Sequence, residues 1–308
     1  MPAPRAAVDV GSNSVRLLVL DGDGTRRTRV MRITRLAAGV DATGHLDDAA
    51  LSRTLEVMAS YREVWREHGV TDRVRIAATS AVRDAADRDR FFTGVQDVTG
   101  VGAEVITGDE EAALAFAGAV AAVDVPRPTA VLDIGGGSTE LIVGDGAGRV
   151  AGAVSMQLGC VRVTERHLTD DPPSAADLLA ARGLIDAELE AGTRTLADLG
   201  ADPRTARALV AVAGTATTLG ALHLGLDSYD EDRIHGTRLP ADALDDLAAR
   251  LSAMTAAERG QLGPVQPGRE DVIHGGALVL QAALACTGLD EVVISEADGL
   301  DGLAASLA

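Results

Sequence analysis

The sequence of 308 residues contains no lysine, so all 28 of its basic residues are arginines. This absence excludes a Walker-type phosphate loop and a pyridoxal Schiff base, since both depend on a lysine. Aromatic residues make up only 2% of the chain, which leaves no stacking platform for single-stranded nucleic acid. The core must therefore be built from alanine, valine, leucine and isoleucine.

Basic residues are also few in relation to acidic ones. The 28 arginines face 46 acidic residues, which gives a formal net charge of −18. A charge of this sign opposes binding to nucleic acid and to anionic membranes. We therefore expect neither partner, and an anionic ligand would need local arginines, backbone N–H groups or a metal ion.

Cysteine and long apolar runs are scarce as well. Cys160 and Cys286 are the only cysteines, and their wide separation predicts two buried, reduced thiols of the kind found in a reducing cytosol. No run of 18 apolar residues occurs, and Asp9 and Arg16 interrupt the apolar N-terminal stretch. The sequence thus predicts neither a membrane span nor a signal peptide. We expect a soluble, cytoplasmic protein.

Two other kinds of active site lack their sequence signatures. The six histidines form no pair with metal-binding spacing, and no G-x-S-x-G segment is present. A histidine metal centre and a serine hydrolase triad are therefore not expected.

A duplication is the strongest feature that is present. The segment DVGSNSVRLLVLDG at 9–22 is similar to DIGGGSTELIVGDG at 133–146. Each segment predicts a β-hairpin with small residues in its turn. The distance along the chain between the two segments is about the length of a domain and is too long for a solenoid repeat. We therefore predict two similar domains, 1–124 and 125–308, and the last helix could pack on the first of them.

The remaining sequence predicts a mixed α/β fold. Apolar residues spaced by three and four predict helices, and short apolar runs predict strands. The expected helices are 47–68, 109–123, 174–199, 241–254, 271–287 and 300–308, and the expected strands outside the two hairpins are 30–36, 74–79, 103–107, 209–213 and 291–295.

The first hairpin turn has the composition of a phosphate site. Gly11 lets a ligand approach the backbone, and Ser12, Asn13 and Ser14 add side-chain donors beside free turn amides. Asp9, at the end of the strand, is placed to hold a metal ion or its water. The structural alternative is a tight hairpin with an Asx turn.

The second hairpin turn is richer in glycine. Gly135, Gly136 and Gly137 precede Ser138, and three consecutive glycines weaken an ordinary hairpin but let backbone amides surround an anion. Asp133 and Glu140 bracket this turn and could together bind magnesium. A wide flexible loop is the alternative.

Three further segments carry candidate groups: a turn, an arginine and a pair of carboxylates. Gly214 and Thr215 follow a predicted strand and open a predicted helix, where amides can hold an anion. Arg83 could grip two phosphate oxygens, although a local ion pair would also explain it. Glu110 fits a capping box, which leaves Glu111 as the candidate base, with a surface first-turn glutamate as the alternative.

Together these segments resemble the Ppx/GppA family of exopolyphosphatases and guanosine pentaphosphate phosphohydrolases. The resemblance rests on DVGSNS at 9–14, ATSAVR at 78–83, GDEEA at 108–112, DIGGGSTE at 133–140 and GT at 214–215, in this order. It implies an α/β fold of two ribonuclease-H-like domains of the actin-like ATPase (ASKHA) superfamily, with the active site in the cleft between them.

The resemblance also implies roles for single residues. Glu111 corresponds to the catalytic base and Arg83 to the phosphate-gripping arginine. The turns 11–14 and 135–138 correspond to the phosphate loops. The metal ligands correspond to Asp133 and Glu140, with Asp9 as a weaker third. The segment 269–276 matches a family stretch in which Arg269 could hold the rest of the substrate, and Arg16 and Arg162 are further candidates.

The implied activity is release of orthophosphate from the ends of inorganic polyphosphate. Magnesium, or manganese in its place, would assist in-line attack of a water activated by Glu111. The sequence resembles the short, actinobacterial type of exopolyphosphatase and ends at Ala308, without the C-terminal helical domains that help longer members to dimerise. A homodimer stays an open possibility.

Several other functions remain open from the sequence. The same chemistry could act on guanosine pentaphosphate (pppGpp), and the sequence does not decide between the two substrates. An actin-like sugar or acyl kinase shares the paired phosphate loops, but the position of Glu111 favours water as the acceptor. A non-catalytic sensor of polyphosphate or alarmone would keep the fold, yet Glu111 and Arg83 are both present.

Overall fold

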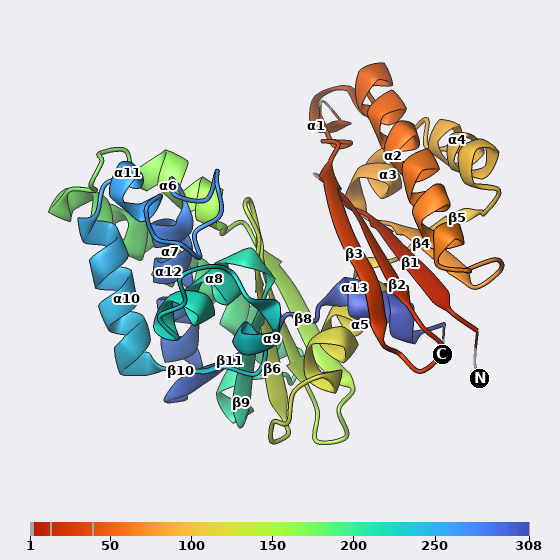
Figure 1. Cartoon of the computed structure of the whole chain (residues 1–308). Coiled ribbons are helices and arrows are strands. Elements are labelled where there is room, and N and C mark those ends of the chain that lie inside the picture. The colour runs from red at the N-terminus through yellow and green to blue at the C-terminus, as the bar shows by residue number, and fades with distance from the viewer. Residues whose placement is uncertain (1–2, 13, 39, 308) are drawn as a thin grey trace. The chain divides into compact units, whose positions relative to one another are not determined.

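The computed structural model describes residues 3–12, 14–38 and 40–307, so the predicted ligand Asn13 lies outside the described residues. The chain divides into two compact units (Figure 1). The first unit comprises Met1–Gly118 and Gly299–Ala308, and the second comprises Ala119–Asp298. The domain limits expected from the sequence, 1–124 and 125–308, are not tested by this division and stay a prediction.

The first unit is built on a five-stranded sheet with the order β3-β2-β1-β4-β5. Strands β1, β2 and β3 form an antiparallel meander, and β4 and β5 continue parallel to β1. Its elements are β1 (Arg5–Val10), β2 (Ser14–Leu20), β3 (Arg26–Ile33), α1 (Val40–Thr43), α2 (Asp48–Glu67), β4 (Val74–Ala78), α3 (Ser80–Asp84), α4 (Asp89–Thr99), β5 (Ala103–Val105), α5 (Gly108–Ala121, which runs into the second unit) and α13 (Gly299–Ala305).

Helices cover both faces of this first sheet. Side chains of α2 and α4 pack on Val8 and Val10 of β1, whereas α13 packs on the opposite face against Ala7 and Leu18. Figure 1 shows α2 and α13 on the two sides of the strands. Because side chains alternate between the faces of a strand, Asp9 lies on the face that α13 partly covers.

Helix α2 shows how the sequence sets these boundaries. The Asp47 side chain accepts a hydrogen bond from the Ala50 backbone N–H at 2.9 Å and so caps the first turn. Met58, Tyr61 and Trp65 are almost completely buried on one side of the helix. The spacing of three and four therefore predicted this helix to within a residue at each end.

The second unit is built on a six-stranded sheet with the order β10-β11-β9-β6-β7-β8. Strands β6, β7 and β8 form the antiparallel meander, and β9 and β11 run parallel to β6. Its elements are β6 (Thr129–Ile134), β7 (Thr139–Gly144), β8 (Val150–Met156), α6 (Cys160–His167), α7 (Ala175–Asp198), η1 (Pro203–Thr205), β9 (Ala208–Val212), α8 (Ala213–His223), α9 (Glu231–Ile234), β10 (Arg238–Pro240), α10 (Ala241–Ala253), α11 (Ala256–Arg259), α12 (Ile273–Thr287) and β11 (Glu291–Ile294).

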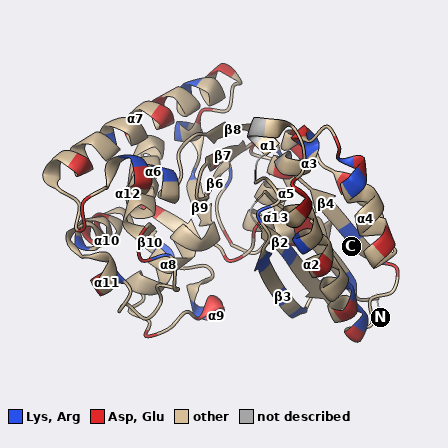
Figure 2. Cartoon of the chain, turned by 90° about the horizontal axis from the view of Figure 1, so that it is seen from above, with Lys and Arg blue, Asp and Glu red and all other residues tan. Residues whose placement is uncertain are grey.

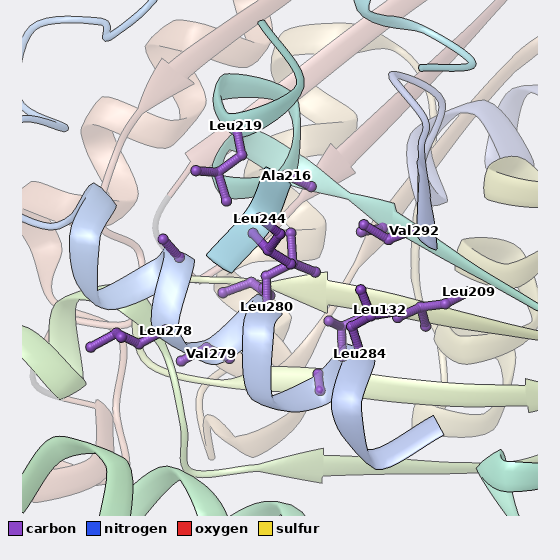
Figure 3. Packing of buried hydrophobic residues seen from close by; sticks show 14 of the residues in the cluster. Leu132, Leu209, Ala216, Leu219, Leu244, Leu278, Val279, Leu280, Leu284 and Val292 are labelled. Atoms are coloured by element: carbon purple, nitrogen blue, oxygen red, sulfur yellow. The ribbon is translucent and has the colours of Figure 1, made fainter. Parts of the chain in front are cut away.

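One aliphatic core joins the second sheet to its helices. Leu132 of β6 and Leu209 of β9 pack with Leu280 and Leu284 of α12 (Figure 3). Further leucines and alanines of α7, α8 and α10 extend the cluster. This core contains no tryptophan or phenylalanine, whereas the core of the first unit buries Tyr61, Trp65 and Phe91, so the expectation of a purely aliphatic core is wrong there.

The two sheets share one topology, an antiparallel meander of three strands followed by parallel strands. This shared order confirms the duplication and the α/β fold class with two ribonuclease-H-like units. The active-site cleft expected between the domains stays a prediction.

Three details differ from the expectations. Strand β3 ends at Ile33, three residues before the expected end, because residues 34–38 turn back and Ala37 N–H donates to Ser12 O. Helices α4 and α6 and strand β8 were not predicted. Both cysteines are free as expected, but each is partly exposed rather than buried. Within the described residues, no helix is both long and apolar enough to cross a bilayer.

Candidate active site

An ion pair crosses the first hairpin beside its turn. The turn closes through Gly11 N–H, which donates to Ser14 O at 3.0 Å. Asp9 on β1 faces Arg16 on β2 in the register. Arg16 donates to Asp9 Oδ2 from Nη2 at 2.6 Å and from Nε at 3.0 Å. The negative charge of the Asp9 carboxylate is thus already compensated by Arg16, and a metal cation at Asp9 would have to compete with this guanidinium.

The predicted base and the predicted phosphate-gripping arginine lie together in the first unit. Arg83 is in the last turn of α3, and Glu111 is in the first turn of α5. Arg83 Nη1 lies 3.8 Å from Glu111 Oε2 and also donates to Ile106 O at 3.2 Å. The side chain of Arg83 is 36% exposed and that of Glu111 is 46% exposed. An incoming anion and a water can therefore reach them.

The neighbouring Glu110 is bound elsewhere. Its backbone N–H donates to Thr107 Oγ1 at 3.2 Å, as the capping motif predicts. Its carboxylate accepts a hydrogen bond from Arg75 Nη2 at 2.7 Å. Arg75 also donates to Glu104 and to Ser306. The second glutamate of the pair is therefore the one directed to Arg83.

The glycine turn of the second unit packs tightly on the start of α6. Gly136 O accepts hydrogen bonds from the backbone N–H groups of Val161 and Arg162 at 3.0 and 3.1 Å. A Cβ on Gly159 would lie 2.4 Å from Gly136 O, so only glycine allows this approach. Arg162 Nε donates to Gly137 O at 2.7 Å. These contacts fix the turn, which is therefore not a loose loop.

Two carboxylates face each other behind this turn. Asp133 on β6 is opposite Glu140 on β7, at the positions that Asp9 and Arg16 occupy in the first unit. Like charges directly opposite each other destabilise a sheet unless a cation or a hydrogen bond compensates them. Ser155 supplies part of the compensation, since its hydroxyl donates to Glu140 Oε1 at 2.7 Å.

This pair of carboxylates suits a magnesium ion. Magnesium is usually held by one or two carboxylates together with waters and substrate phosphates. Within the described residues, no group of three or more acidic, cysteine or histidine side chains is placed to hold a metal. A site of two carboxylates would therefore depend on the substrate to complete the coordination.

The third predicted phosphate segment carries its own arginine. Strand β9 ends at Val212, and α8 begins at Ala213, whose φ of 65° is unusual for a residue with a side chain. A Cβ on Gly214 would lie 1.7 Å from Arg269 Nη1, so this guanidinium lies directly on the glycine. Backbone strain such as the positive φ of Ala213 is frequent at functional sites.

Thr215 and Cys160 adjoin the same place. A Cβ on Gly276 would lie within 2.8 Å of Thr215 Oγ1 and 3.2 Å of Cys160 Cβ. Cys160 is the first residue of α6, and its N–H donates to Gly135 O at 3.0 Å. Burial raises the pKa of the Cys160 thiol. The start of α6 therefore lies next to two of the predicted segments of the second unit, the glycine turn and Gly214-Thr215.

A buried arginine that the sequence did not indicate supports Arg269. Arg259 is 2% exposed and donates to Glu270 O from Nε at 2.6 Å. It also donates to Leu251 O and Met254 O from Nη1, at 3.0 and 2.6 Å. It thereby fixes the residue that follows Arg269. An arginine between two alanine-rich helices gives no sequence signal for such a role.

His274, in the first turn of α12, is buried beside Arg259 and Asp171. Burial first, and then the Arg259 charge, lowers its pKa from 6.5 to about 4. The folded state thus favours the neutral ring, and stability falls as the pH drops from the unfolded pKa near 6.5 toward 4.

This shift gives a prediction for acid stability. When the pH falls from 7 to 5, the free energy of unfolding should decrease by about 2 kcal/mol, because His274 can take up a proton only in the unfolded state. Urea unfolding at both pH values measures the loss for wild type and for His274→Leu. The variant should lose about 2 kcal/mol less over this interval, and equal losses would contradict the burial argument.

Comparison with known proteins places these features in a family. A family model described as the Ppx/GppA phosphatase family matches residues 25–306. The chain is 43% identical over 320 residues to exopolyphosphatase 2 of Mycobacterium tuberculosis (strain ATCC 25618 / H37Rv), covering 98% of each protein. Among solved structures, it is similar to an exopolyphosphatase-like protein (38% identity, TM-score 0.80, 98% and 97% coverage). It is also similar to the Ppx/GppA phosphatase of Aquifex aeolicus (27% identity, TM-score 0.88, 99% coverage of each). The chain belongs to the Ppx/GppA phosphatase family.

Proposed function

We propose that this protein is an exopolyphosphatase, a phosphoric anhydride hydrolase that releases orthophosphate from the ends of inorganic polyphosphate. The observation that carries the proposal is the exposed pair of Arg83 and Glu111 beside the helix start of α5. Its family membership and the name of its 43% identical relative support it.

Glu111 and Arg83 have separate roles in this proposal. The Glu111 carboxylate accepts a proton from a water, whose oxygen attacks the terminal phosphorus in line with the bridging oxygen. The bridging P–O bond breaks, and the shortened chain leaves with that oxygen. Arg83 binds equatorial oxygens of the terminal phosphate, where a guanidinium can offer two parallel hydrogen bonds. No covalent intermediate with the protein is required.

The small-residue turns hold phosphate groups in this proposal. Backbone N–H groups in such turns bind anions without adding a charged side chain. The residues proposed to bind phosphate, through backbone N–H groups or side-chain donors, are Gly11, Ser12, Asn13, Ser14, Gly135, Gly136, Gly137, Ser138, Gly214, Thr215 and Arg269. Local, fixed donors of this kind suit a chain with a net charge of −18, because they bind an anion in spite of that charge.

Asp133 and Glu140 are proposed to hold magnesium, or manganese in its place. A bound divalent ion would neutralise charge on the phosphate oxygens. Asp9 is the weakest of the three candidates, because Arg16 already compensates its charge. We further propose that the protein works in the cytoplasm, and that a homodimer is possible.

Removal of one carboxylate tests the metal site. Glu140→Gln should raise the magnesium concentration for half-maximal activity about tenfold or more, since second-shell changes alone cost 10–100-fold in metal affinity. Glu165→Gln removes an exposed carboxylate of α6 and is the control. A magnesium titration of orthophosphate release compares them, and equal midpoints would remove Glu140 from the site.

A substrate panel tests the proposed activity. Orthophosphate release is measured with magnesium for short polyphosphate, long polyphosphate, guanosine pentaphosphate and ATP under identical conditions. The proposal predicts the highest kcat/KM for polyphosphate. A clear preference for guanosine pentaphosphate would assign the protein to the other activity of the family. Binding of polyphosphate without release would instead indicate a sensor.

A further inference from the structure

A hollow of about 420 Å³ lies at the end of strand β3 in the first unit. Its lining residues are Ile33, Thr34, Arg35 and Arg53. Two of these four are arginines and none is acidic, in a chain with 46 acidic and 28 basic residues. The ribbon in Figure 2 is coloured red at acidic residues, which occur along the helices, including α2. A hollow with only positive charge is therefore a local exception.

Arg53 is fixed at the wall of this hollow. It lies on α2, and its Nε and Nη2 both donate to Thr34 O, at 3.3 and 3.1 Å. This bidentate contact holds the guanidinium in one orientation and ties α2 to the turn that follows β3. Among the described residues, no acidic side chain is recorded as its ion-pair partner.

Arg35 has an unusual backbone conformation in this turn. Its φ is 54°, in the left-handed region that favours glycine. The conformation persists because the turn is bonded on both sides: Ala38 N–H donates to Arg35 O at 3.0 Å, and Ala37 N–H donates to Ser12 O at 2.9 Å. The Arg35 side chain is exposed, and within the described chain it has no recorded ion pair. Backbone strain of this kind is retained where function requires it.

The same hydrogen bonds connect the hollow to the first phosphate turn. Ser12, whose carbonyl accepts from Ala37, is one of the residues proposed to bind phosphate. The hollow is thus linked to this turn by the short segment of chain after β3, which is hydrogen-bonded to Ser12. A ligand with several linked phosphates is the kind of anion that could use both places.

We propose that Arg35 and Arg53 form a second phosphate-binding subsite, which holds a phosphate group other than the one that is cleaved. Two guanidinium groups on a hollow that no acidic residue lines supply both the charge and the paired donors that a phosphate group needs. The inference rests on the proposed function only for the source of that phosphate, which is either the remote part of the polyphosphate chain or free orthophosphate.

Binding measurements test the subsite without turnover. Isothermal titration calorimetry follows long polyphosphate, tripolyphosphate and orthophosphate separately, in the Glu111→Gln background. Arg35→Gln should weaken binding of the subsite ligand about tenfold, the usual loss for a hydrogen bond to a charged group. Arg66→Gln is the control, since it removes an exposed arginine of the same helix α2 on the order of 20 Å from Arg53.

The ligands distinguish the two sources. If Arg35→Gln binds long polyphosphate more weakly but orthophosphate as before, the subsite holds part of the substrate chain. In the enzyme that retains Glu111, Arg35→Gln should then raise KM for long chains without changing kcat. A loss for orthophosphate alone identifies a separate site for the free ion. If Arg35→Gln and Arg66→Gln bind all three ligands equally, the subsite does not exist.

A second variant separates binding from folding. Arg35→Gly suits the left-handed φ, so its thermal midpoint should rise by about 2 °C while polyphosphate or orthophosphate binding falls as in Arg35→Gln. A rise in stability without loss of binding would also overturn the proposal. Wild type that binds polyphosphate but releases no orthophosphate would contradict the proposed function and leave the test of the subsite intact.

Discussion

Glu111→Gln is expected to lower kcat for polyphosphate by at least about 100-fold, the usual contribution of a general base. Glutamine keeps the size of the side chain but cannot accept the proton of the attacking water. Arg83, 3.8 Å from the Glu111 carboxylate, keeps its bond to Ile106 O, so substrate binding should change little. Initial rates of orthophosphate release over a range of polyphosphate concentrations measure both parameters.

Glu110→Gln is the matched control for this prediction. It removes the adjacent carboxylate, which is bound to Arg75 rather than to Arg83. An exposed ion pair contributes little, so kcat should stay within about threefold of wild type. If Glu110→Gln loses activity and Glu111→Gln does not, the base has been assigned to the wrong residue of the pair.

Arg259→Met is expected to lower the free energy of unfolding by about 3 kcal/mol or more. The change removes the hydrogen bonds that the guanidinium donates to the carbonyl groups of Leu251, Met254 and Glu270. It also removes the buried charge that faces Asp171. Breaking such a buried arrangement by deleting one partner typically costs about 3–5 kcal/mol.

Urea unfolding of wild type and Arg259→Met measures this loss. Arg194→Met is the control, because Arg194 is exposed and pairs with the exposed Glu190 along α7, so its removal should cost less than about 1 kcal/mol. Because Arg259 also fixes the residue after Arg269, the folded variant should show a higher KM. A loss similar to that of Arg194→Met would mean that Arg259 does not support this region.

The duplication made most of the fold predictable. Periodic apolar residues are a local property, so α2, α7 and the hairpin strands were located to within a few residues. Helix α6 was missed because it spans only 8 residues, too few for a clear periodic pattern, and it begins where Gly159 allows a close approach to Gly136. Strand β3 was displaced because the hydrogen bond from Ala37 to Ser12 ends it early.

The candidate site was only partly predictable for the same reason. The pairing of Arg83 with Glu111 follows from residues that stand in recognisable segments. The contrast between Asp9–Arg16 and Asp133–Glu140 needed the strand register. Arg35, Arg53 and Arg259 carry no local signal, because what distinguishes them is a hollow, a backbone angle and burial.

The central claim is that water attacks the terminal phosphorus of a polyphosphate chain. The most direct measurement is hydrolysis of polyphosphate in ¹⁸O-labelled water, with mass spectrometry of the orthophosphate and of the remaining chain. The account predicts one ¹⁸O atom in each orthophosphate released and an unlabelled chain shortened by one unit at a time, with the labelled product formed at least about 100-fold more slowly by Glu111→Gln. Label at the new end of the shortened chain, or release of internal fragments, would contradict it.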